Sequence, residues 1–278
     1  MNLPDASQPA LPPGSFEILI AVAVLLMVWG LRVYVRGARL ISREGGKVNS
    51  QPLDLPEAMF ATLLAGFLVL LALQGFAMKS LPVTPQRLIG SAEFFGMIVL
   101  AVVATLKVRH HSLGELFGWR RLSFPRLVSR AVVYLLAAFP LVAVVNVGMA
   151  KLLGDRGDMQ DIVKFFLSAN QRHDYPAIAE TIVLAAIVAP IFEEFIFRGF
   201  LYGVARRYLG MVPAIILVST LFGAIHSNLA VLPGLTLLSV CFCLAYEATG
   251  SLFTSMIMHA LFNLTSLLVM MLSMHALP

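Results

Sequence analysis

The chain has 278 residues, of which 59% are hydrophobic and only 13% are charged, and its mean hydropathy is +0.87. A soluble domain is typically about half apolar and a quarter charged, so a soluble globular protein is excluded. The net charge of +5 comes from basic residues clustered beside apolar blocks. This clustering is typical of loops that face an anionic membrane leaflet, and it argues against a nucleic-acid partner.

The apolar residues form blocks of roughly 17 to 25 residues, the length of a helix that crosses about 30 Å of hydrocarbon. We therefore predict an all-α polytopic protein of the lipid bilayer with about eight transmembrane helices. The predicted spans are 16–34, 58–78, 88–106, 131–153, 176–208, 212–226, 229–246 and 251–274. The boundaries of the sixth and seventh spans stay open, because Pro233 and Gly234 can end one span or kink the other.

The basic residues around the first span predict its orientation. No lysine or arginine precedes it, and Arg32, Arg36, Arg39, Arg43 and Lys47 lie at or after its end. A secretory signal peptide has the opposite polarity, so we expect a retained span with the N-terminus outside. The chain is then expected to divide into a membrane region of four helices (1–153), an external loop with a short helix (154–175) and a catalytic core of four helices (176–278).

The loop after the third span contains LGELFGWRRLSF, residues 113–124, which mixes leucine, phenylalanine and tryptophan with arginine. This mixture favours a segment that lies along the lipid headgroups, and an ordinary solvated loop is the alternative.

The last four spans carry polar residues that are costly in hydrocarbon and therefore indicate a functional site. They are Glu193, Glu194 and Arg198 in IFEEFIFRGFL, His226 in LFGAIH, and His259 and Asn263 in MHALFN. Glu194 and Arg198 are four residues apart, so they can pair on one helix face. Glu193 is rotated by about 100° from Glu194 on an ideal helix and needs another partner.

These residue types together indicate amide hydrolysis. A carboxylate and a neutral imidazole can hold and deprotonate a water molecule. A second imidazole and an amide can donate hydrogen bonds to an oxyanion. Zinc is the alternative, with Glu193, His226 and His259 as candidate ligands, because two histidines and a glutamate form many catalytic zinc sites. The HExxH pattern that places both imidazoles on one helix face is absent.

The same residues resemble the motifs of a known family. EEFIFR, FGAIH and HALFN are similar to the EExxxR, FxxxH and HxxxN/D motifs, in that order, of the CAAX prenyl protease and bacteriocin-processing (CPBP, or Abi) family of intramembrane endopeptidases. The resemblance implies that Glu193 and His226 activate water and that His259 and Asn263 stabilise the oxyanion. Glu194, Arg198 and Phe222 would support the site. The family is described as metalloproteases, yet a glutamate-and-water mechanism fits it, so the metal question stays open.

We therefore expect an intramembrane endopeptidase that acts on a membrane-associated peptide or protein. The compact loops and the absence of organellar signals favour a bacterial inner membrane. The alternative is a non-catalytic membrane protein, either an immunity or scaffold factor or a proton-coupled transporter that uses the same carboxylates and histidines as a relay. Related halves, which transporters often show, are not visible in the sequence.

Overall fold

The computed structural model describes residues 15–78, 83–154 and 160–276, so part of the predicted external loop, 155–159, lies outside the described residues. Regular structure in the described ranges is helical and includes no strand, which confirms the predicted all-α class. The elements are α1 (Ser15–Glu44), α2 (Leu55–Ala77), α3 (Pro85–Val108), α4 (Leu113–Leu116), α5 (Phe124–Leu153), α6 (Asp161–Gln171), α7 (Tyr175–Val183), the π-helix η2 (Leu184–Val188), α8 (Ala189–Glu194), the π-helix η3 (Phe195–Leu201), α9 (Tyr202–Leu209), α10 (Met211–Ala224), α11 (Leu232–Thr249) and α12 (Leu252–Ala276).

Seven helical segments in the described ranges are long and apolar enough to cross a membrane. The remaining predicted span, 212–226, forms the shorter helix α10, whose 14 residues rise about 21 Å at 1.5 Å per residue. That is less than the roughly 30 Å of a hydrocarbon core. The helix ends before a polar turn in which Ser227 has a φ of 50°. The side chain of Asn228 accepts the backbone N–H of Ala230 there and directs the chain toward α11.

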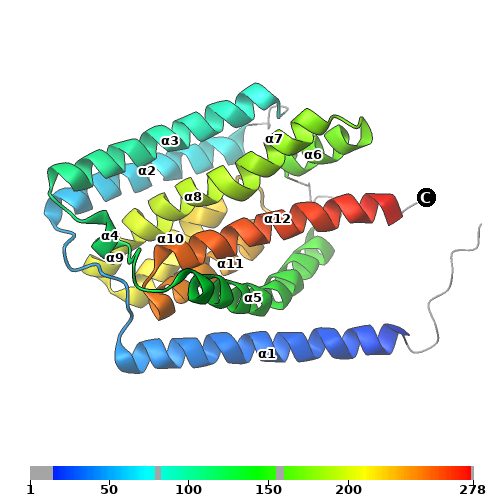
Figure 1. Ribbon diagram of the computed structural model, residues 1–278. Coiled ribbons are helices and arrows are strands. Elements are labelled where there is room, and N and C mark those ends of the chain that lie inside the picture. Colours follow the sequence, from blue (N-terminus) through cyan, green and yellow to red (C-terminus); the bar gives the residue numbers. More distant parts are fainter. Residues whose placement is uncertain (1–14, 79–82, 155–159, 277–278) are drawn as a thin grey trace, which may run out of the picture.

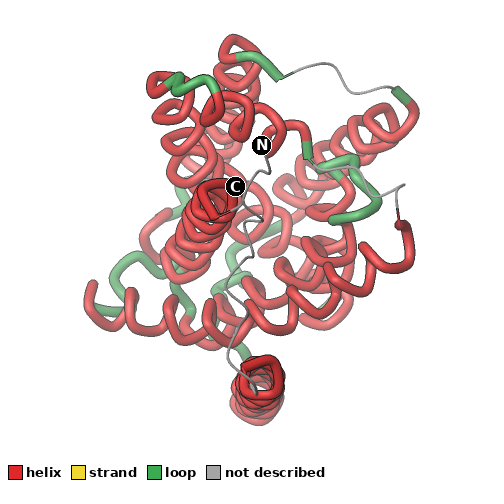
Figure 2. Tube along the Cα trace, turned by 90° about the vertical axis from the view of Figure 1, so that its right-hand side faces the viewer, coloured by secondary structure: helices red, strands yellow, loops and turns green. Residues whose placement is uncertain are grey.

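The long helices run side by side (Figure 1), and the 35-residue segment from α7 to α9 packs against α12 within the bundle. One buried apolar cluster joins α2, α3, η3, α9 and α10, and a second joins α1, α5, α11 and α12. Both views place α1 at the edge of the bundle (Figures 1 and 2), where it packs on α5 and α11. The segment that carries the glutamates packs on α3 and α12 and leaves Ile187 and Ile191 on its outer face exposed.

Side-chain caps fix where several helices begin. Thr84 accepts the backbone N–H of Arg87 at 3.4 Å at the start of α3, and Asp174 accepts that of Ala177 at 3.3 Å at the start of α7. A proline follows each cap, as is common in the first helical turn, where its missing N–H costs no helical hydrogen bond.

The apolar residues of segment 113–124 divide between the core and the surface: Leu113, Leu116 and Phe117 are buried, whereas Trp119 and Phe124 are exposed. A position along the lipid headgroups stays a prediction for its exposed part. Phe117 is 1% exposed, and its carbonyl accepts the backbone N–H of Leu252 at 3.0 Å. Gly118 allows this close approach: its φ is +66°, and a Cβ on it would clash with the carbonyl of Gly250. The segment thus fixes the start of α12 against the rest of the bundle.

Candidate active site

The two adjacent glutamates lie on α8, in the middle of the segment from Tyr175 to Leu209. At 1.5 Å per residue, Glu193 is about 24 to 27 Å from either end of that segment. The π-helices η2 and η3 flank α8 on both sides, and such stretches are rare and frequent at functional sites. Glu194 is fully buried, whereas the side chain of Glu193 is 15% exposed.

A proline explains how Asn263 is attached to this segment. In η2 the backbone N–H of Ala189 bonds to the carbonyl five residues earlier, at Leu184. The next donor in that pattern would be residue 190, but Pro190 has no N–H. The carbonyl of Ala185 instead accepts the side-chain amide of Asn263 at 2.8 Å. One amide hydrogen of Asn263 thus ties α12 to the turn before the glutamates, and an amide has a second to donate.

Glu194 joins two of the sequence motifs. Its Oε1 accepts Nη1 of Arg198 at 2.8 Å, which is the predicted pair, and also Nδ1 of His259 at 2.9 Å, which the sequence did not indicate. An ionised carboxylate can only accept, so Nδ1–H of His259 is the donor in this bond. A neutral His259 ring therefore presents the lone pair of Nε2 on its opposite side.

That opposite side of the ring faces Glu193. Oε2 of Glu193 lies 3.9 Å from Nε2 of His259, which is longer than a direct hydrogen bond. The unpaired glutamate therefore has an imidazole from α12 as its neighbour. His226, the other imidazole expected near Glu193, is farther away, since no contact within 4.0 Å between the carboxylate and that ring occurs in the described residues.

The sequence predicted that His226 lies within a helix. It lies instead in the turn after α10, because that helix ends at Ala224. Its Nδ1 lies 2.8 Å from the carbonyl of Phe222, four residues earlier. A carbonyl can only accept, so Nδ1 carries the hydrogen and Nε2 of the neutral ring is free to accept. The four-residue spacing thus forms a bond from side chain to backbone instead of a shared helix face.

Two phenylalanines hold the polar groups in place. The guanidinium of Arg198 lies 4.3 Å from the ring centre of Phe222, and the rings of His226 and His259 lie 5.1 and 5.8 Å from it. Phe242 of α11 packs on His259 at 5.0 Å. The sequence singled out Phe222 but missed Phe242, which is one of many apolar residues in an apolar span and carries no distinguishing signal.

Several atoms of the buried ion pair have no hydrogen-bond partner among the described residues: Oε2 of Glu194, and Nε and Nη2 of Arg198. Buried polar atoms are usually satisfied, and unsatisfied ones recur at functional sites. The buried ion pair therefore keeps unused hydrogen-bonding atoms in the helical turn that also carries Glu193.

The candidate zinc ligands do not fit a three-ligand site in this arrangement. Across the described residues, no three histidine, cysteine, aspartate or glutamate side chains gather closely enough to hold a metal ion. Both candidate histidines also use Nδ1 for bonds within the protein, to Glu194 and to the Phe222 carbonyl.

Residues 176–265 match the family model of the type II CAAX prenyl endopeptidases, Rce1-like. These residues form an Rce1-like domain. The match confirms the family expected from the motifs, and the domain includes every predicted site residue from Glu193 to Asn263. A domain of this family implies a membrane protease that acts on a protein substrate, in agreement with the seven long apolar helices of the described residues. No curated protein and no solved structure gave a match to the chain.

Proposed function

We propose that the protein is an intramembrane endopeptidase that hydrolyses a peptide bond in a membrane-associated peptide or protein. The observation that carries this proposal is the approach of Glu193 and His259, which come from different helices and face each other at 3.9 Å in the middle of the bundle. This distance is too long for a direct hydrogen bond, so Oε2 of Glu193 stays free to accept from a water molecule and Nε2 of His259 stays free to face the substrate carbonyl.

In the proposed reaction Glu193 is the general base. It takes one hydrogen of the water, whose oxygen forms a bond to the carbonyl carbon of the substrate while the carbonyl oxygen becomes negative. The proton then passes from Glu193 to the amide nitrogen as the C–N bond breaks. The products are a carboxylic acid and an amine, and Glu193 ends in its initial state.

His226 holds the attacking water in this proposal. Its Nδ1–H is bound to the Phe222 carbonyl, which directs the lone pair of Nε2 away from the backbone. That lone pair accepts the second hydrogen of the water. His226 and Glu193 are not in direct contact, and in this proposal the water molecule bridges them.

His259 and Asn263 stabilise the negative oxygen. Glu194 accepts Nδ1–H of His259 and so fixes the orientation of the ring. In the doubly protonated form of this ring, Nε2–H donates toward the reacting carbonyl. Asn263 contributes the amide hydrogen that it does not give to Ala185. Glu194 and Arg198 thus act as positioning residues, and Phe222 packs on both of the histidines and on Arg198.

The proposed orientation places the N-terminus outside the inner membrane of a bacterium. The basic residues in the C-terminal part of α1 and just after it, and those that begin α5, would then face the cytoplasm, as the positive-inside tendency requires. Gly46 and the side chains of Arg206 and Glu247 lie against each other, so α1, α9 and α11 end on the same side.

The test compares membrane peptides from cells that carry the intact protein with those from cells that carry Glu193→Gln. This change keeps the size of the side chain but removes the base. Peptides cleaved only by the intact protein are then synthesised and incubated with purified protein. We expect Glu193→Gln to lower the cleavage rate by at least about 100-fold, within the usual contribution of a general base. Glu93→Gln, an exposed position on α3, is the matched control and should cleave normally. Equal products from Glu193→Gln cells would refute the proposal.

A further inference from the structure

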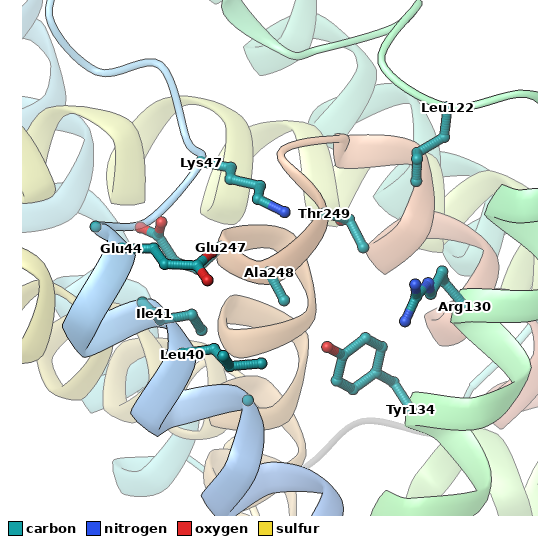
Figure 3. Close-up of a pocket in the computed structure, with 12 residues that line it drawn as sticks. Leu40, Ile41, Glu44, Lys47, Leu122, Arg130, Tyr134, Glu247, Ala248 and Thr249 are labelled. Carbon is teal, nitrogen blue, oxygen red and sulfur yellow. The ribbon is translucent and has the colours of Figure 1, made fainter.

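A cavity of about 230 Å³ lies away from the catalytic residues, between the last turns of α1, the first turns of α5 and the end of α11 (Figure 3). A second cavity of about 520 Å³ lies along the start of α5. Leu122 and Arg130 line both, so the two cavities adjoin. Together they are much larger than the space that a single water molecule needs.

The cavities lie at the level of a lipid headgroup. Glu44 is the last residue of α1, Arg126 and Arg130 lie in the first two turns of α5, and Thr249 is the last residue of α11. All three helices are long and apolar enough to span the hydrocarbon core, so their ends lie at the membrane surface. Phospholipid phosphates occupy this depth.

The lining carries uncompensated positive charge. Lys47, Arg126 and Arg130 contribute three cations, and Glu44 and Glu247 contribute two carboxylates. Glu247, however, is fully buried and already compensated by an ion pair with Arg206. Three cations against the single charge of Glu44 leave a net charge of +2, and none of the three forms an ion pair within the described residues.

The side chains converge on one space. Figure 3 shows the ammonium of Lys47, the guanidinium of Arg130 and the hydroxyl of Tyr134 pointing into the gap between the helices. Leu40 of α1 and Val133 of α5 add apolar surface to the same lining. A lining with cations on one part and hydrocarbon on another matches a phosphate attached to acyl chains better than a free inorganic ion.

We propose that this cavity binds the headgroup of an anionic membrane phospholipid, with Lys47, Arg126 and Arg130 contacting the phosphate and Tyr134 donating a hydrogen bond. Because α1 packs on the bundle chiefly through α5 and α11, the bound lipid fastens α1 to the rest of the protein. A ligand that binds the folded state also raises thermal stability, which gives a second measurable consequence.

The experiment uses the full chain, purified in detergent, with phosphatidylglycerol and phosphatidylcholine of identical acyl chains. Native mass spectrometry measures bound lipid, and thermal unfolding is followed in parallel. We expect phosphatidylglycerol to bind more tightly and to raise the unfolding temperature. The double variant Lys47→Gln and Arg130→Gln should weaken phosphatidylglycerol binding by about 30-fold, since each basic residue at a membrane surface contributes roughly a five-fold change.

Arg43→Gln is the matched control, because it removes an exposed cation of α1 that does not line either cavity. An equal loss of binding in Arg43→Gln, or equal binding of the two lipids by the wild type, would overturn the proposal. Inorganic phosphate that displaces the lipid at similar concentrations would also overturn it, by assigning the site to a soluble anion. If the double variant does not fold, Arg126→Gln at an exposed position replaces it, with about a five-fold loss expected.

Discussion

Replacing Glu194 by glutamine separates the positioning role of this residue from the catalytic role proposed for Glu193. Glu194 is the ion-pair partner of Arg198 at 2.8 Å, both side chains are 0% exposed, and no other ion pair of Arg198 occurs in the described residues. Glu194→Gln keeps an oxygen that can accept a hydrogen bond but leaves the guanidinium without an opposite charge. We therefore expect both stability and cleavage to fall.

The size of the loss follows from burial. Removing one partner of a buried ion pair typically costs about 3 to 5 kcal/mol, because the remaining charge stays desolvated. For a chain of this size, each kcal/mol lowers the unfolding temperature by about 2 to 4 °C, so Glu194→Gln should unfold on the order of 10 °C earlier. Glu193→Gln should change stability by less than about 1 kcal/mol, because Glu193 forms no close ion pair.

The assay is thermal unfolding of both variants in the same detergent, together with cleavage of a peptide identified as above. A double variant, Glu194→Gln with Arg198→Met, provides the decisive control. Removing the stranded charge should restore most of the stability, because apolar residues can replace a buried pair at little cost. Activity should stay low, since the His259 ring has lost its carboxylate. Equal stability of Glu193→Gln and Glu194→Gln, or full activity of the double variant, would refute this reasoning.

Two further predictions concern the segments that position the site. Gly118→Ala should lower the free energy of unfolding by about 1 to 3 kcal/mol, because Gly118 has a positive φ and a Cβ on it would clash with the carbonyl of Gly250. Gly114 has ordinary space for a Cβ, so Gly114→Ala should be neutral in the same denaturation assay. Asn263→Leu should cost about 1 to 3 kcal/mol by leaving the Ala185 carbonyl unpaired. Pro190→Ala supplies a backbone N–H that can bond to the Ala185 carbonyl, so Asn263→Leu should cost less stability in the Pro190→Ala background. If the effects of the two substitutions on the free energy of unfolding simply add, the proposed replacement of one donor by the other is contradicted.

The fold class could be read from the sequence because hydrocarbon imposes a simple rule. Every backbone polar group in a bilayer must be satisfied internally, so long apolar blocks form helices whatever their neighbours are. The length rule also has a limit, which residues 212–226 show. Their composition is as apolar as that of the other blocks, but α10 stops at Ala224, where polar side chains bond to the backbone and turn the chain.

The motifs likewise named the candidate site residues but did not predict all of their bonds. A spacing of four residues predicts a pair such as Glu194 and Arg198, because both lie on one helix. It says nothing about contacts between helices, so the bond from Glu194 to His259 and the packing of Phe242 were not foreseeable. For the same reason the spacing did not indicate that, of the two imidazoles, the ring of His259 is the one that lies 3.9 Å from Glu193.

The sequence alone determined that this chain is helical and membrane-embedded and that its polar residues belong to a protease family, since hydropathy and motif spacing are local properties. The tertiary structure decided which side of each imidazole is free, how Asn263 replaces the donor missing at Pro190, and that a cationic cavity forms beside α1. These features depend on how separate helices approach and turn, which side-chain packing fixes and spacing along one chain does not encode.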